Sequence, residues 1–176
     1  LILYVLFIQP VSLSAALAQG SNFPADVNSK DLPNFHTVHP YLLRSGEPSE
    51  AGMHELSKRG VKTLIDLRAR GERSKLEEAQ AKALNMQYIN LPMSDKAPTT
   101  DQVKTLMETI RKGKETNSPV LVHCAHGSDR TGCMIGIWRV SEDGLSYDQA
   151  YKEMRKYYFG PQYKQLSAAV KAHATK

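Results

Sequence analysis

The ten residues HCAHGSDRTG at positions 123–132 place Cys124 and Arg130 on one short loop with five residues between them. The apolar run at 120–122 predicts a buried strand before this loop, and residues 131–140 predict a helix after it. The backbone N–H groups of a loop that joins a strand to a helix start can form a concave nest, and the helix dipole adds positive charge there. The segment therefore predicts a site for a phosphate-sized dianion that requires no metal ion.

The two functional groups of this loop suit the same substrate. The guanidinium of Arg130 can hold two phosphate oxygens at once. Donors that stabilise a bound phosphate also stabilise a thiolate, so we expect Cys124 to act as a nucleophile. The expected phosphate-binding loop consists of Ala125, His126, Gly127, Ser128, Asp129 and Arg130.

On these residues the chain resembles the cysteine-dependent protein tyrosine phosphatase superfamily, whose signature is His-Cys, five residues, then Arg followed by Ser or Thr. The segments LLRSGEPS at 42–49, TLIDLRARGE at 63–72 and LPMSD at 91–95 are similar to its bacterial dual-specificity-type branch. The resemblance extends from about residue 32 to about residue 165. It implies a phosphomonoester hydrolase that works through a phosphocysteine intermediate, without a cofactor or metal.

Such chemistry needs a proton donor for the leaving oxygen, and the same group can later activate water. We expect Asp95 to be this general acid, because LPMSD matches the position of the acid in the family. An ordinary loop aspartate that caps a turn is the alternative. Asp101 is the nearest competitor, but it falls in the first turn of the next expected helix, where acidic residues favour the dipole.

Other residues of the signature are expected to support the nucleophile. The resemblance implies that the Thr131 hydroxyl donates a hydrogen bond to the cysteine sulfur. We expect His123 to hydrogen-bond nearby backbone and fix the geometry of Cys124, and His126 either to line the pocket rim or to be solvated. Because a carboxylate would repel phosphate, the side chain of Asp129 is expected to point away and to pair outside the pocket, with Arg44 or Arg68 as candidate partners.

Arg44 and Arg68 each follow an apolar segment typical of a strand, and strand ends are where sites gather in α/β folds. One interpretation is that both steer phosphate. The other, which we favour for Arg68, is a local ion pair with Glu72, and Asp66 is expected to be structural.

Strands and helices alternate along the chain. Strands are expected near 35–38, 41–43, 61–67, 87–91 and 120–123, and helices over 49–60, 72–84, from Thr99 to about Lys112 with Gly113 ending it, after Ser146, and from about Pro161. This order predicts a single α/β domain with a central, mostly parallel, four- to five-stranded sheet flanked by helices. A chain of 176 residues that is 41% hydrophobic has material for one core.

The first residues have a different character. Residues 1–18 carry no charge and end in the small-x-small pattern of Ala16 and Ala18, which predicts a secretory signal peptide truncated at its start. We therefore expect a secreted or periplasmic bacterial protein, with an uncleaved N-terminal anchor as the alternative. Residues 19–31 are expected to be a flexible lead-in and 32–176 the phosphatase domain.

The chain has two cysteines, Cys124 and Cys133. An oxidising compartment favours disulfides, yet the nucleophile must stay free. Cys133 is most simply a small buried helix residue, and a reversible bond between the two cysteines is the alternative.

A net charge of +5 favours anionic substrates, and no motif for nucleic acid is present. By analogy with the family, a chain this short favours a shallow cleft that accepts phosphotyrosine and also phosphoserine or phosphothreonine on proteins. Ala125 and Ser128 stand where phosphoinositide-specific relatives often carry lysines. A phosphoinositide phosphatase, a phosphate-recognition module without turnover, and sulfur-transfer or arsenate-type redox chemistry are the alternatives. We expect a monomer with no stable membrane insertion once the signal is removed.

Overall fold

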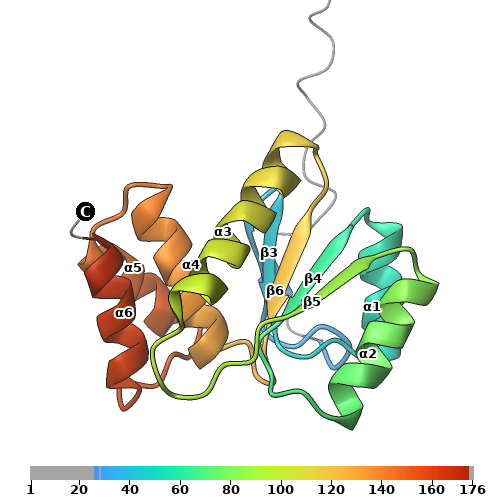
Figure 1. Cartoon of the computed structure of the whole chain (residues 1–176), viewed down its shortest axis with the longest axis horizontal. Helices are drawn as coiled ribbons and strands as arrows, with labels where there is room; N and C mark the ends of the chain where they lie inside the picture. Colours follow the sequence, from blue (N-terminus) through green and yellow to red (C-terminus); the bar gives the residue numbers. More distant parts are fainter. Residues whose placement is uncertain (1–25, 28, 175–176) are drawn as a thin grey trace, which may run out of the picture.

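The computed structural model describes residues 26–27 and 29–174. It contains one six-stranded sheet in the order β1-β2-β3-β6-β4-β5 (Figure 1). The strands are β1 (Asp26–Val27), β2 (Phe35–His39), β3 (Leu42–Ser45), β4 (Thr63–Asp66), β5 (Gln87–Asn90) and β6 (Val120–His123). The signal-peptide prediction for residues 1–18 lies outside the described residues.

The sheet is mostly parallel, as predicted. Strands β3, β6, β4 and β5 pair in parallel, whereas β2 pairs antiparallel with β3 and β1 antiparallel with β2. The two-residue strand β1 is additional to the expected four or five strands, and it lies within 19–31. Within the expected lead-in, the backbone of Asp26 and Val27 adds an edge strand.

In the described part of the chain six helices flank the sheet: α1 (Glu50–Lys58), α2 (Glu72–Ala83), α3 (Thr100–Glu115), α4 (Asp129–Ser141), α5 (Tyr147–Lys156) and α6 (Lys164–Ala174). Figure 1 shows α1 and α2 on one face of the sheet and the other four on the opposite side. The protein has a hydrophobic core on each face of the sheet, because successive side chains of a strand point to opposite faces. Leu64 and Leu121 pack toward α1 and α2, whereas Ile65 and Val122 pack into the larger core with α3 to α6.

Two expected helix boundaries are wrong. Helix α3 does not end at Gly113 but continues to Glu115. A Cβ at Gly113 would lie 2.7 Å from the Ser118 carbonyl oxygen and from a Val120 methyl carbon, so this glycine permits a close approach to the following strand instead of ending the helix. The last helix begins at Lys164, three residues after the expected start at Pro161.

The fold gathers three loops at one edge. Asp66 is the register partner of both Asn90 and His123, the last residues of β5 and β6. Because these strands are parallel, the segments that follow them leave the same edge of the sheet. Within the described residues, no helix combines the length and the apolar character needed to cross a bilayer.

Candidate active site

The segment from Cys124 to Arg130 joins β6 to the first turn of α4, as the sequence predicts. Cys124 is 2% exposed, and its Sγ accepts a hydrogen bond of 3.3 Å from the backbone N–H of Gly127. Gly127 has a φ of +72°, and a Cβ there would lie 2.5 Å from the Gly46 nitrogen and the Ser45 carbonyl carbon. The loop therefore curls around the sulfur at a position that only glycine accommodates.

The end of β3 supports this loop from behind. The N–H of Glu47 donates to the carbonyl oxygen of Ala125 at 3.2 Å. Arg44, which is 0% exposed, donates from Nη2 to the carbonyl oxygen of Gly127 at 2.7 Å and lies 4.6 Å from the ring centroid of Tyr157. Burial lowers the pKa of Arg44 to about 10, so the side chain stays cationic at neutral pH. Arg44 thus holds the outer side of the loop and is not an exposed phosphate-steering charge.

The carbonyl oxygen of Leu67 links the loop to the segment that carries the expected general acid. It accepts a hydrogen bond from Arg130 Nη1 at 3.5 Å and one from the N–H of Met93 at 3.1 Å. Asp95 lies two residues after Met93 on the same segment, and its side chain is exposed. The structure therefore brings the segment of Asp95 to the arginine of the phosphate loop, and the role of Asp95 as acid stays a prediction.

The remaining signature residues take distinct positions. His126 is exposed at the surface of the loop, and Thr131 is fully buried. Within the described part of the chain the Thr131 hydroxyl has no hydrogen-bond partner, so its bond to the cysteine sulfur stays a prediction.

Asp129 is not bound to either expected arginine. Its Oδ1 accepts a hydrogen bond of 2.7 Å from the N–H of Gly160, in the segment between α5 and α6. The expected partners are engaged elsewhere: Arg44 with Gly127, and Arg68 with three carboxylates. Asp129 thus anchors the α5–α6 connection to the start of α4.

Arg68 lies at the centre of a buried charged cluster, and the predicted local pair with Glu72 is wrong. The guanidinium contacts Asp66 at 2.8 Å and also contacts Glu47 and Glu77, while Glu72 pairs with Lys75 at the surface. A buried cation gains more from desolvated carboxylates than from an exposed one four residues away. Burial opposes the charge of Arg68, but hydrogen bonds to Asp66 and Glu47 outweigh it and raise its pKa.

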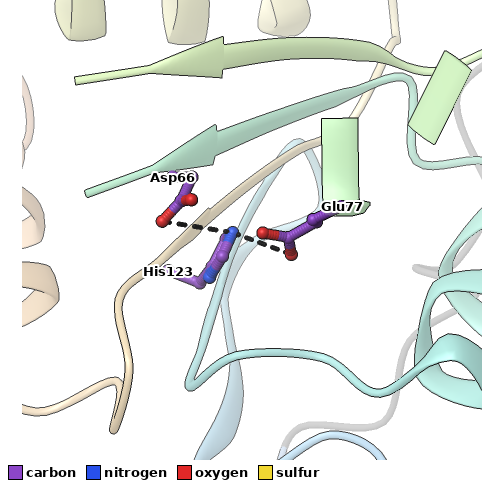
Figure 2. Close-up of side chains that lie close together, drawn as sticks. All are labelled: Asp66, Glu77 and His123. Atoms are coloured by element: carbon purple, nitrogen blue, oxygen red, sulfur yellow. Dashed lines mark ion pairs between the residues drawn. The ribbon is translucent and has the colours of Figure 1, made fainter. Parts of the chain in front are cut away.

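His123 connects this cluster to Cys124. Figure 2 shows its ring between the carboxyl groups of Asp66 and Glu77, with Nε2 3.9 Å from Asp66 Oδ1 and 3.2 Å from Glu77 Oε1. Its Nδ1 lies 3.4 Å from the carbonyl oxygen of Cys124. Burial lowers the pKa of His123 to about 4, so the imidazole is neutral at physiological pH.

The carboxyls of the cluster differ in protonation. Burial raises the pKa of Asp66, but hydrogen bonds from Arg68 and Tyr88 and the proximity of His123 outweigh it, and the net shift is downward. Burial raises the pKa of Glu77 to about 8, against the opposing charge of Arg68. The ionised form is therefore favoured at Asp66, whereas burial disfavours it at Glu77.

Asp66, Glu77 and His123 offer ligand atoms that lie within 4.8 Å of one another, a spacing that a metal ion could use. The guanidinium of Arg68, however, already contacts both carboxyl groups. A second cation at this point would meet a fixed positive charge, so the donor set fits an ion pair better than a metal.

Cys133 is a buried residue of α4, as predicted, and is not bonded to Cys124. Its thiol donates to the carbonyl oxygen of Leu166 at 3.4 Å, and burial raises its pKa to about 12. Both cysteines are free thiols in this structure. Neither the pKa nor the packing of Cys133 suits a second working thiol.

Sequence reasoning missed Glu77 and the supporting role of Arg44. Glu77 is 4% exposed within a helix that is otherwise rich in charge, next to Glu78, which forms an exposed pair with Arg70. No local sequence pattern distinguishes Glu77 from Glu78. For Arg44, its position at the end of an apolar segment did indicate that it lies near a functional site.

Comparison with known proteins agrees with this geometry. Residues 22–172 match the family described as DSP-PTPase phosphatase fused to NAD+ kinase. The chain is 28% identical over 149 residues to the dual specificity protein phosphatase TpbA of Pseudomonas aeruginosa, an alignment that covers 84% of this chain and 66% of the relative. It is 27% identical over 109 residues to the inositol diphosphatase DSP5 of Arabidopsis thaliana, covering 61% of this chain and 53% of the relative.

The fold is also similar to a solved structure. The crystal structure of P. aeruginosa TpbA matches with a TM-score of 0.68 at 21% identity, covering 87% of this chain and 98% of that chain. The overall fold is thus that of a known structure. The chain belongs to the DSP-PTPase phosphatase family, within the superfamily of cysteine-dependent protein tyrosine phosphatases.

Proposed function

We propose that this chain hydrolyses phosphomonoesters through a phosphocysteine intermediate on Cys124, and that its substrates are proteins phosphorylated on tyrosine and on serine or threonine. The observation that carries the proposal is the buried Cys124 sulfur, which accepts the Gly127 N–H inside the loop that ends at Arg130. An N–H directed at sulfur stabilises a thiolate, and the same loop can surround the three oxygens of a phosphoryl group.

The reaction has two steps. The Cys124 thiolate attacks phosphorus, the bond from phosphorus to the leaving oxygen breaks, and Asp95 gives that oxygen its proton. Water then attacks the phosphocysteine, the Asp95 carboxylate takes a proton from it, and the sulfur leaves as a thiolate with release of inorganic phosphate. Arg130 and the loop N–H groups stabilise the charge on the transferred phosphoryl group in both steps.

The test is hydrolysis of p-nitrophenyl phosphate with a chelator present, with vanadate as inhibitor. The wild type is expected to turn over and to be inhibited. The Cys124→Ser variant is expected to lose turnover while still binding phosphorylated peptides, and Cys133→Ser is the matched control that retains turnover. Activity that survives in Cys124→Ser would contradict the mechanism, and peptide binding by an inactive wild type would point to a recognition module.

A second candidate substrate class is a phosphorylated inositol. The inositol diphosphatase DSP5 is among the relatives of this chain. A parallel panel of phosphopeptides, phosphoinositides and inositol diphosphates distinguishes the two classes, and we expect the highest kcat/KM on phosphopeptides.

We further propose that residues 1–18 direct export of a monomeric enzyme to the periplasm or the medium. The uncharged apolar stretch that ends at Ala18 supports this proposal. Fractionation of cells that express the full precursor, with N-terminal sequencing of the product, tests it. A product that stays in the membrane with residues 1–18 attached would favour the anchored alternative.

A further inference from the structure

Asn34 is a buried polar residue that contacts the phosphate loop from behind. It lies in the turn before β2, is 6% exposed and has a φ of +50°, a left-handed conformation that asparagine tolerates better than most residues. Its Nδ2 donates to the carbonyl oxygen of His126 at 3.3 Å and to that of Tyr157 at 3.4 Å. The side chain therefore joins the loop to the end of α5.

The partners of Asn34 determine which way its amide group faces. The two carbonyl oxygens can only accept hydrogen bonds, so the amide nitrogen faces them. The Oδ1 atom faces Nε2 of His36, 2.8 Å away, and accepts the hydrogen bond that this ring nitrogen donates. The His36 ring lies against the Tyr157 ring, with the two centroids 3.9 Å apart. Contacts on both sides of the amide thus fix the side chain of Asn34.

The peptide group between His126 and Gly127 connects Asn34 to the sulfur. In a trans peptide the C=O and N–H bonds point in opposite directions, and this peptide is trans. Its carbonyl oxygen accepts from Asn34, and its N–H donates to Cys124 Sγ at 3.3 Å. A donor that holds the carbonyl outward therefore also holds the N–H toward the sulfur.

The next peptide group of the loop has a partner of the same kind. The carbonyl oxygen of Gly127 accepts from Arg44, whose guanidinium lies 4.6 Å from the ring centroid of Tyr157. By the same geometry, the N–H of Ser128 points away from the side on which Arg44 lies. Residues outside the loop thus orient two consecutive peptide groups, and Tyr157 contacts both Asn34 and Arg44.

The turn that contains Asn34 is itself held against the loop. The N–H of Gly46, just after β3, donates to the carbonyl oxygen of Pro33 at 2.7 Å, and a Cβ at Gly46 would lie 3.1 Å from the carbonyl carbon of His126. The Ser128 hydroxyl also donates to the His126 carbonyl, at 3.5 Å. Because Ser128 belongs to the loop, it cannot fix this peptide relative to the sheet, whereas Asn34 can.

We propose that Asn34 is a positioning residue of the phosphatase: by binding the His126 carbonyl it directs the Gly127 N–H at the Cys124 sulfur and stabilises the reactive thiolate. The proposal rests on the phosphatase function proposed above. A residue that only joined α5 to the sheet would affect stability and leave the chemistry of the sulfur unchanged. The reactivity of Cys124 therefore separates the two roles.

Two variants remove the donor without straining the backbone. Asn34→Gly removes the side chain and leaves a residue that adopts a φ of +50° readily. Asn34→Asp keeps the size but places an oxygen in front of the two carbonyl oxygens. Asn117→Gly and Asn117→Asp are the matched controls, because Asn117 has a φ of +51°, is exposed and lies before β6, at the opposite end of that strand from Cys124.

The first measurement is hydrolysis of p-nitrophenyl phosphate and its inhibition by vanadate. Asn34→Gly is expected to lower kcat/KM about tenfold or more and to weaken vanadate inhibition by a similar factor, because the carbonyl loses the donor that holds it outward. Asn34→Asp is expected to lose at least as much. Both Asn117 variants are expected to stay within about twofold of the wild type.

The second measurement is the rate at which iodoacetate alkylates each cysteine at pH 6, followed by mass spectrometry. Both Asn34 variants are expected to slow the alkylation of Cys124 at least about threefold, because the thiolate is the form that reacts. Cys133, which is 0% exposed, reports any loosening of the fold. Loosening would speed the alkylation of both cysteines, so the direction of the change distinguishes positioning from a structural role.

The outcomes separate this proposal from the proposed function. Folded Asn34 variants that keep the kcat/KM and the Cys124 alkylation rate of the wild type would overturn the positioning role and leave the phosphatase function intact, and faster alkylation of both cysteines would also overturn it. Alkylation needs no turnover. Slower alkylation in the Asn34 variants of a protein that does not hydrolyse phosphate would therefore support the positioning role and count against the phosphatase function.

A crystal structure of the wild type with vanadate bound decides the matter if the Asn34 variants do not fold. The Asn34 amide nitrogen is expected within hydrogen-bond distance of the His126 carbonyl oxygen, with the Gly127 N–H directed into the pocket. A His126 carbonyl that faces a different donor in that structure would overturn the proposal.

Discussion

Arg44 donates a hydrogen bond of 2.7 Å to the carbonyl oxygen of Gly127, and both residues are buried. This contact couples the end of β3 to the loop that curls around the Cys124 sulfur. A carbonyl that points away from the pocket leaves the neighbouring N–H groups free to point into it. The buried cation thus orients the loop from behind.

Replacement of Arg44 by Met tests this role. The apolar side chain fills similar space but leaves the Gly127 carbonyl buried without a donor, which costs about 1–3 kcal/mol of unfolding free energy. Vanadate affinity is also expected to fall, because the loop loses its orientation. Urea unfolding and vanadate inhibition measure the two effects. Arg70→Met, at an exposed ion pair, is the control and is expected to change stability by less than about 0.5 kcal/mol.

Gly127→Ala is expected to slow hydrolysis strongly. The φ of +72° strains any L side chain, and the new Cβ would lie 2.5 Å from backbone atoms of Ser45 and Gly46. The loop must therefore move, and kcat/KM is expected to drop by at least about 10²-fold. Gly144→Ala is a matched control, because Gly144 has a φ of +70° and a Cβ added there would meet no atom within 4 Å. Gly144→Ala is therefore expected to lose only the free energy of the backbone strain, about 1 kcal/mol, and to keep its activity. Full activity in Gly127→Ala would show that the loop does not bind the phosphate.

Asp95→Asn is expected to slow hydrolysis of phosphotyrosine by roughly 10²–10⁴-fold, because the amide cannot protonate the leaving oxygen. The defect is expected to shrink for leaving groups that depart without a proton. Steady-state kinetics with a series of aryl phosphates measure this dependence. Asp101→Asn, in the first turn of α3, is the control. If the leaving group made no difference to the Asp95→Asn defect, the acid would have to be sought elsewhere.

Stability is expected to depend on pH through Glu77 and His123 together. Folding raises the pKa of Glu77 from 4.5 to about 8 and lowers that of His123 from 6.5 to about 4. Between about pH 4.5 and 6.5 the pair holds one proton in either state, on Glu77 when folded and on His123 when unfolded, and so adds no slope. Between about pH 6.5 and 8 only the folded state holds it, and the free energy of unfolding falls as the pH rises.

Over that upper window the wild type is expected to lose about 1–2 kcal/mol from this pair, whereas Glu77→Gln is expected to lose none from it. Urea unfolding of both proteins at pH 6.5 and pH 8 measures the difference. Equal slopes in the two proteins would mean that Glu77 is ionised in the folded state at both pH values.

The sequence predicted the fold class well because strands and helices here follow local patterns. Val120–His123 is continuously apolar until its last residue, and the capping box of Thr99 and Gln102 marks the start of α3. The predicted end of α3 was wrong because a glycine can stand in a helix for either of two structural reasons. Gly113 could end a helix or allow close approach, and only its contact with Ser118 and Val120 distinguishes them.

By itself, the sequence predicted Cys124 as the nucleophile and determined that Cys124 and Arg130 share one loop, because both lie within one contiguous stretch of chain. Only the tertiary structure decided which charges surround His123, that Arg68 binds Asp66 and Glu77 and not Glu72, and that Asp129 accepts from Gly160. These choices depend on burial, which makes a contact between distant segments far stronger than an exposed contact between neighbours. Spacing along the chain does not indicate which of the adjacent residues Glu77 and Glu78 is buried in the folded protein.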